Sequence, residues 1–84
     1  MVELSYVITD PLGFHARPVM RLASEAARWK SDVTVRHGAH VASGRDPMAL
    51  MGLEAGPGAE LAITVEGPDE NDAAEFIEHT LREL

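Results

Sequence analysis

The sequence contains no cysteine and few basic residues. Without cysteine, the chain can form no disulfide, no thiolate nucleophile and no cysteine-ligated zinc or iron–sulfur site, and this composition is typical of a reducing compartment. Its 7 lysine and arginine residues face 14 acidic residues, so the formal net charge is −7 at pH 7. A protein of this charge repels nucleic acid and anionic membranes, and we therefore exclude both as general partners.

Long apolar segments are absent as well. No run approaches the roughly 20 apolar residues that a membrane-spanning helix needs. The first five residues, Met1 to Ser5, have neither the basic start nor the apolar stretch of a secretory signal peptide. We therefore expect a cytoplasmic protein without membrane insertion.

The chain has room for one domain, residues 1–84. A mass of 9.1 kDa predicts a folded surface of about 4,900 Å², which leaves roughly 60% of the unfolded surface buried. The hydrophobic fraction of 45% and the charged fraction of 25% are ordinary for a globular protein. No repeat, linker or low-complexity segment interrupts the sequence, so we predict a single domain with no second catalytic unit.

The spacing of apolar residues predicts seven elements of secondary structure. The order of these elements is βαββαβα, with a hairpin turn at His37–His40 in the middle. This order favours an α+β fold in which a mostly antiparallel sheet is covered on one face by helices. Period-two alternation indicates strands near residues 2–8, 33–35, 41 and 61–65, and helical spacing indicates helices over 16–28, 47–53 and 70–84.

The residues at the start of the first predicted helix are the best candidates for chemistry. His15 and Arg17 lie where a loop enters this helix, and Pro18 lies in its first turn, where a missing N–H costs little. Free N–H groups at a helix N-terminus, that of Ala16 among them, bind phosphate, and a guanidinium can hold two phosphate oxygens. An imidazole beside these donors predicts a phosphoryl-accepting site, although such residues near a helix start are more often only solvated.

One segment of the sequence carries a family motif. Residues Pro11–Pro18, PLGFHARP, resemble the active-site signature of the histidine-containing phosphocarrier protein HPr of the bacterial sugar phosphotransferase system. The spacing to Ser43–Leu53 and to the loop Gly56–Gly58 is similar too, so the resemblance extends over the whole chain. It implies an HPr-like open-faced β-sandwich, in which a four-stranded antiparallel sheet lies under three helices.

The same resemblance implies a phosphocarrier and not an enzyme. Enzyme I, charged by phosphoenolpyruvate, would phosphorylate His15 at Nδ1, and enzyme IIA domains of sugar permeases would accept the group. Arg17 and the N–H of Ala16 would stabilise the phosphate. The resemblance further implies that the protein needs no cofactor and is a monomer that docks transiently. A transcriptional regulator is one more partner that the sequence leaves open.

The second predicted helix divides its larger apolar residues between two faces. Leu50 and Leu53 share one face, and Met48 and Met51 share another, so one pair must lie outside the core. By resemblance the methionines face outward, and their adaptable side chains suit a surface that meets several partners. The alternative is that they are ordinary half-buried residues. The docking surface that the resemblance implies consists of Met20, Pro47, Met48 and Met51.

The chain departs from many members of the family at position 46. HPr proteins of Gram-positive type often carry a serine there, which a dedicated kinase phosphorylates, whereas this sequence has Asp46 followed by Pro47. The serine switch is therefore expected to be absent. Asp46 is either an N-cap of the short helix, which we favour, or a partial mimic of phosphoserine.

Three other interpretations remain. His37 and His40 could ligate a metal, but no third ligand lies near them in sequence, and we predict no metal site. The chain could be an HPr paralogue that serves a dedicated regulatory, nitrogen-related or dihydroxyacetone-kinase branch, an alternative that the missing serine at position 46 leaves open. It could also be a regulatory binding module without phosphotransfer, against which the intact His15 and Arg17 argue.

Overall fold

The computed structural model describes residues 1–84 and has the predicted order of elements. None of its helices is long and apolar enough to cross a membrane. The element bounds are β1 Val2–Val7, α1 Ala16–Ala26, β2 Asp32–His37, β3 His40–Ser43, α2 Pro47–Met51, β4 Glu60–Glu66 and α3 Glu70–Arg82.

Each helix begins at the predicted residue and ends two residues before the predicted end. The reason is the same for all three helices. After each helix the chain tightens into a turn with hydrogen bonds between residues three apart. These bonds join Arg28 N–H to Glu25 C=O, Leu53 N–H to Leu50 C=O, and Leu84 N–H to Leu81 C=O.

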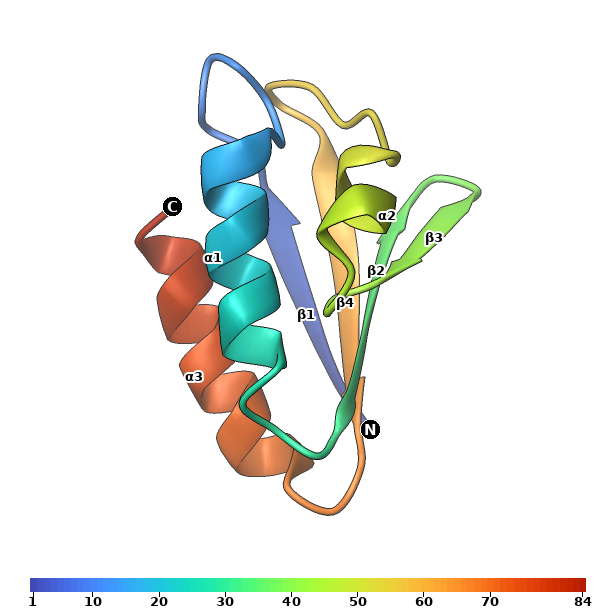
Figure 1. Ribbon diagram of the computed structural model, residues 1–84, viewed down its shortest axis with the longest axis vertical. Coiled ribbons are helices and arrows are strands. Elements are labelled where there is room, and N and C mark those ends of the chain that lie inside the picture. The colour runs from blue at the N-terminus through green and yellow to red at the C-terminus, as the bar shows by residue number, and fades with distance from the viewer.

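The four strands form one antiparallel sheet in the order β1-β4-β2-β3. Leu4 pairs with Ile63, and Ile63 pairs with Val35, so apolar residues of three neighbouring strands point to the same face. Figure 1 shows the three helices together over one face of the sheet, with α1 and α3 side by side. The predicted open-faced β-sandwich is therefore confirmed.

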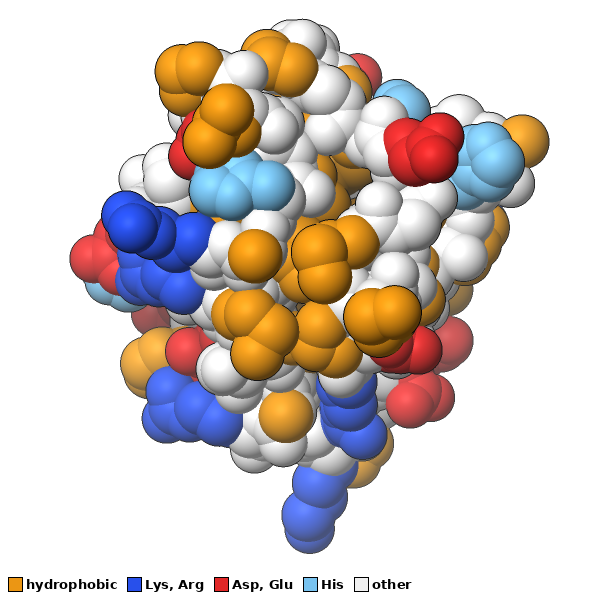
Figure 2. Space-filling view, turned by 45° about the horizontal axis from the view of Figure 1, so that its top comes forward, with side chains coloured by type: hydrophobic (Ala, Val, Ile, Leu, Met, Phe, Trp, Pro, Cys, Tyr) orange, Lys and Arg blue, Asp and Glu red, His pale blue; other side chains and the backbone are white.

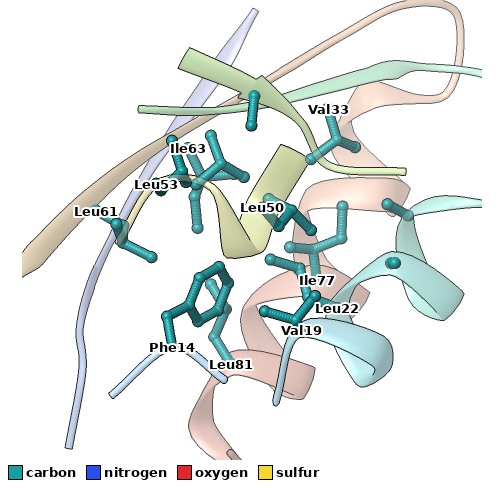
Figure 3. Packing of buried hydrophobic residues seen from close by; sticks show 14 of the residues in the cluster. Phe14, Val19, Leu22, Val33, Leu50, Leu53, Leu61, Ile63, Ile77 and Leu81 are labelled. Carbon is teal, nitrogen blue, oxygen red and sulfur yellow. The ribbon is translucent and has the colours of Figure 1, made fainter. Parts of the chain in front are cut away.

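The core fills the space between the helices and the sheet. It consists of 19 buried hydrophobic residues, and the accessible surface of 4886 Å² agrees with the area expected from the mass. Val19 of α1, Leu50 of α2, Ile77 of α3 and Ile63 of β4 are fully buried and meet in its centre (Figure 3). Each helix thus contributes one apolar face, as its sequence spacing predicts.

The C-terminal end of α1 is held by side chains from two other loops. The Asp69 carboxylate accepts hydrogen bonds from the N–H groups of Lys30 and Ser31, both at 2.9 Å, and from the Ser31 hydroxyl at 2.5 Å. These bonds hold the pKa of Asp69 below its usual value, and the bond from the Ser31 hydroxyl has the largest effect. The Arg45 guanidinium donates to the carbonyl groups of Trp29 and Ser31. The loop that follows α1 is therefore anchored, at the end of the helix opposite the candidate site.

Candidate functional site

A tight loop leads from β1 into α1. Gly13 donates its N–H to the carbonyl of Asp10 at 2.9 Å, and Leu12 donates to the Asp10 carboxylate at 2.9 Å. Gly13 has a φ of +78°, a left-handed conformation that glycine adopts without a Cβ penalty. Phe14 is buried, and its N–H donates to the carbonyl of Ala55 at 2.9 Å. These contacts fix the residue that follows, His15.

His15 is the N-cap residue of α1. Its backbone is extended, its carbonyl accepts the N–H of Val19 at 3.0 Å, and its ring forms no hydrogen bond to the helix backbone. The ring is 32% exposed, and Nε2 lies 3.1 Å from Oδ2 of Asp10. Helix geometry leaves the N–H groups of the first turn without an intrahelical acceptor, which applies here to Ala16 and Arg17. The imidazole is thus both held in place and accessible.

Arg17 and Arg21 differ in their pairing. Arg21 donates to the Glu83 carbonyl at 3.2 Å and to its carboxylate at 3.1 Å, which fixes the C-terminal end of the chain against α1. Arg17 is exposed and forms no ion pair. Both arginines line a shallow hollow that also includes Asp10 and Leu84. Of the two guanidinium groups, that of Arg17 is the one left available for an anion.

Asp10 lies beside two hydrogen-bonding groups and near the positive charge of Arg17. The Leu12 N–H, followed by the hydrogen bond with His15, lowers the pKa of the Asp10 carboxyl, and the charge of Arg17 acts in the same direction. Asp10 is not among the residues that the sequence predicts for this site. Its contact with His15 depends on the closed loop of residues 10–13, and a carboxylate five residues before a histidine is too weak a signal to predict it.

The predicted docking residues lie on α1 (Met20) and on the neighbouring helix α2 (Pro47, Met48 and Met51). Met20, Met48 and Met51 are exposed by 50%, 78% and 39%, and Pro47 is half-buried. Figure 2 shows hydrophobic side chains gathered around a histidine, with basic side chains beside them. Leu12, 77% exposed, is a further apolar residue at this site that the sequence analysis missed. The sequence carries a signal for this residue, because an apolar side chain between Pro11 and Gly13 lies in a turn that cannot bury it.

The short helix α2 separates its apolar residues as predicted. Leu50 and Leu53 are buried, at 0% and 3% exposure, while both methionines of the helix are outside. Asp46 caps this helix, since its Oδ1 accepts the N–H groups of Met48 at 3.1 Å and Ala49 at 3.2 Å. The interpretation of Asp46 as the N-cap of this helix therefore agrees with its contacts.

The remaining histidines lie apart from this arrangement. His37 is half-buried, and its Nδ1 lies 3.1 Å from the carbonyl oxygen of Leu53. His40 is exposed at the β2–β3 hairpin, and His79 lies on α3 within 3.5 Å of Glu83. Of the four histidines, His15 is the one at a helix N-terminus beside an unpaired arginine.

Comparison with known proteins agrees with this geometry. The family model described as the PTS HPr component phosphorylation site matches residues 2–83. The chain belongs to the HPr family. The resemblance read from PLGFHARP is thereby confirmed, and with it a place among the phosphocarriers of the phosphotransferase system, which are carrier proteins rather than catalysts.

Relatives of known sequence or structure span the whole HPr unit. A phosphocarrier protein HPr from Lysinibacillus sphaericus is 34% identical over 84 residues, covering 100% of this chain and 96% of the relative. The solved histidine-containing phosphocarrier protein of Mycoplasma is 30% identical, with a TM-score of 0.93 over 98% of this chain and 93% of that one. The Bacillus subtilis catabolite repression protein Crh, solved as a swapped dimer, is 29% identical, with a TM-score of 0.76 over 99% and 95% of the two chains.

Proposed function

We propose that this HPr-family protein is a cytoplasmic phosphocarrier, one domain over residues 1–84, that receives a phosphoryl group on Nδ1 of His15. The donor is enzyme I, charged by phosphoenolpyruvate, and the acceptors are enzyme IIA domains of sugar permeases. The observation that carries the proposal is a one-third exposed imidazole at the N-terminus of α1, next to the unpaired Arg17, in a chain that matches the family from end to end.

The chemistry required of such a carrier is mainly positioning and charge stabilisation. The Nδ1 lone pair attacks phosphorus while the bond from phosphorus to the donor breaks. The phosphoryl oxygens then meet the N–H groups of Ala16 and Arg17 and the Arg17 guanidinium, all at the positive end of the helix. The exposed apolar residues around His15 exclude water when a partner docks. None of these steps requires a cofactor, and a monomer suffices.

The direct test is incubation of the protein with its cognate enzyme I and labelled phosphoenolpyruvate. We expect about one phosphate per chain, labile in acid and stable in base, as a phosphoramidate on histidine is. The labelled protein should then transfer its phosphate to a sugar-specific enzyme IIA domain. A wild-type protein that remains unlabelled with active enzyme I would contradict the proposal.

A second function keeps the phosphohistidine and changes the acceptor. The observation that favours it is Asp46, which occupies the place of the regulatory serine. A paralogue of a nitrogen-related or dihydroxyacetone-kinase branch would be labelled by its own enzyme I but would transfer poorly to sugar-specific IIA domains. A transcriptional regulator as partner, or a module without phosphotransfer, gains some support from the likeness to Crh. The intact His15 and Arg17 favour a carrier.

Arg17→Ala is expected to keep its fold and to lose phosphotransfer. The side chain is exposed and unpaired, so its removal leaves no buried group without a partner. Loss of one preorganised donor to a phosphoryl oxygen should slow transfer from enzyme I on the order of 100-fold. Arg28→Ala, which removes an arginine beyond the C-terminal end of α1, is the matched control and should keep the wild-type rate. A wild-type rate in Arg17→Ala would remove Arg17 from the site.

Asp46→Asn and Asp46→Ser distinguish a helix cap from a phosphoserine mimic. Both replacements can still accept the N–H groups of Met48 and Ala49, so the stability of α2 should hardly change. If Asp46 is only a cap, the rate of transfer from enzyme I stays within about twofold of wild type, which we expect. A clear gain in both variants would instead indicate that the carboxylate inhibits docking. Asp46→Ala, which lacks any acceptor, should lose about 1 kcal/mol of stability in denaturant unfolding.

A further inference from the structure

We infer that Asp10 is a positioning residue for His15: its carboxylate accepts a hydrogen bond from Nε2–H and so leaves the lone pair of the neutral ring on Nδ1. The inference rests on the proposed function for its consequence, since Nδ1 is the atom proposed to receive the phosphoryl group. The hydrogen bond itself is a property of the free protein. Asp10 contacts no phosphate and is therefore not a catalytic residue.

The loop that precedes α1 fixes the Asp10 side chain in this orientation. Its Oδ1 accepts the N–H of Leu12 at 2.9 Å, and its backbone carbonyl accepts the N–H of Gly13 at 2.9 Å. Oδ2 is left to face the imidazole, with 3.1 Å between Oδ2 and Nε2. The two side chains are about one-third exposed, 33% for Asp10 and 32% for His15. Each carboxylate oxygen thus has one partner, and only one of the two oxygens is required by the turn.

The protonation of the pair follows from the chemistry of its members. An ionised carboxylate has no proton to donate, so the proton between Oδ2 and Nε2 belongs to the ring. Asp10 is ionised at neutral pH, as an ordinary aspartate is, and the Leu12 N–H and after it His15 lower the pKa of the carboxyl further. A neutral imidazole carries one proton, and with that proton on Nε2 the other nitrogen is unprotonated. Nδ1 is then the nucleophile.

The carboxylate also acts on the product of the transfer. When the N–P bond forms at Nδ1 and the bond from phosphorus to the donor breaks, the ring still carries the Nε2 proton and becomes cationic. A carboxylate at 3.1 Å stabilises this charge until the proton leaves or the phosphoryl group is passed on. In the reverse direction the N–P bond breaks, its electron pair returns to Nδ1, and the original tautomer is restored.

Asp10→Asn separates this role from that of a turn residue. The carbonyl oxygen of the introduced asparagine side chain can still accept the Leu12 N–H, so the turn is retained. Its NH₂ group then faces Nε2 and can only donate, which favours the opposite tautomer with the proton on Nδ1. The variant is expected to move the ring proton from Nε2 to Nδ1. Since hydrogen bonds to charged groups are among the stronger ones, phosphotransfer should fall roughly ten- to a hundredfold.

The ring proton can be located by ¹⁵N NMR of His15 without any partner protein. Spectra at roughly pH 8.5, about two units above the ordinary pKa of a histidine side chain, report which nitrogen is protonated in the neutral ring. The wild type should show the Nε2–H form, Asp10→Asn mainly the Nδ1–H form, and Asp10→Ala a mixture. Asp72→Asn makes the same change of charge in the first turn of α3, at the other end of the molecule (Figure 1), and should behave as wild type.

Two results would overturn the inference. One is an Asp10→Asn variant with the wild-type tautomer, whatever its rate, because a slower transfer would then reflect only altered loop structure. The other is a changed tautomer with an unchanged transfer rate, which would leave the hydrogen bond without a role. A wild type that shows the Nε2–H tautomer but takes up no phosphate would contradict the proposed function instead.

Discussion

His15→Ala is expected to take up no phosphate from enzyme I and phosphoenolpyruvate. Alanine removes the nucleophile, and the other three imidazoles lack its setting. His37 lies against the carbonyl of Leu53, and His40 and His79 are exposed on β3 and in the last turn of α3, away from a helix N-terminus. The side chain of His15 gives α1 no capping hydrogen bond, so the variant should keep its fold. Labelling of the wild type and of the variant side by side, with circular dichroism of both, measures this.

The matched control for this substitution is His79→Ala. His79 has an exposed ring that lies 3.5 Å from a carboxylate, that of Glu83, much as the ring of His15 lies near Asp10. It lacks the helix N-terminus and the free arginine, so this variant should be labelled to the wild-type level. Label that persists in His15→Ala at more than a few percent would place the phosphate on another residue and refute the assigned site.

Most of the fold is predictable because its signals are local. Alternation in β1 and β4 and the apolar spacing of α1 decide which side of each element is buried, and the hairpin at Gly38 makes β2 and β3 antiparallel neighbours. The exact helix ends are not predictable in this way. They depend on whether the last turn keeps hydrogen bonds four residues apart or tightens to three, and apolar spacing is nearly the same in both cases.

The candidate site likewise has a part that the local sequence predicts and a part that only the structure shows. His15, Arg17 and Pro18 are contiguous, and a helix start in the sequence is enough to bring them together. The contact of Asp10 with the ring depends on the closed turn of residues 10–13, in which Gly13 has a left-handed backbone. The pairing of Arg21 with Glu83 joins residues 62 apart in sequence, and no local pattern contains it. The sequence thus selects Arg17 by its position, whereas the pairing that occupies Arg21 is seen only in the structure.

The location of this free cation bears on the net charge of −7. The acidic total disfavours anionic partners at long range, whereas the start of α1 presents two N–H groups and an unpaired guanidinium over a few ångströms. Such a short-range positive site can hold one phosphoryl group without attracting nucleic acid. On the proposed function, we expect the apolar residues beside it, rather than charge, to provide most of the contact with partner proteins.

Gly13→Ala is expected to lose about 2–3 kcal/mol of stability and most of its phosphotransfer. At a φ of +78° a Cβ costs roughly 1 kcal/mol, and this Cβ would lie 2.9 Å from the carbonyl oxygen of Ala55. That oxygen accepts the N–H of Phe14, so relief of the contact would weaken a hydrogen bond worth about 1 kcal/mol more. The loop would shift with Phe14 and carry His15 away from Asp10. Denaturant unfolding and the rate of labelling measure the two losses.

Gly38→Ala is the matched control because Gly38 also has a left-handed backbone, whereas no atom lies close to the Cβ that alanine would add. Its φ is +59°, and nothing lies within 4 Å of the added Cβ. This variant should lose only the roughly 1 kcal/mol of the left-handed conformation and should keep the wild-type rate of labelling. The difference between the two variants measures the close approach of the loop to Ala55. Equal losses of stability, or a Gly13→Ala variant with the wild-type rate, would show that this approach does not position His15.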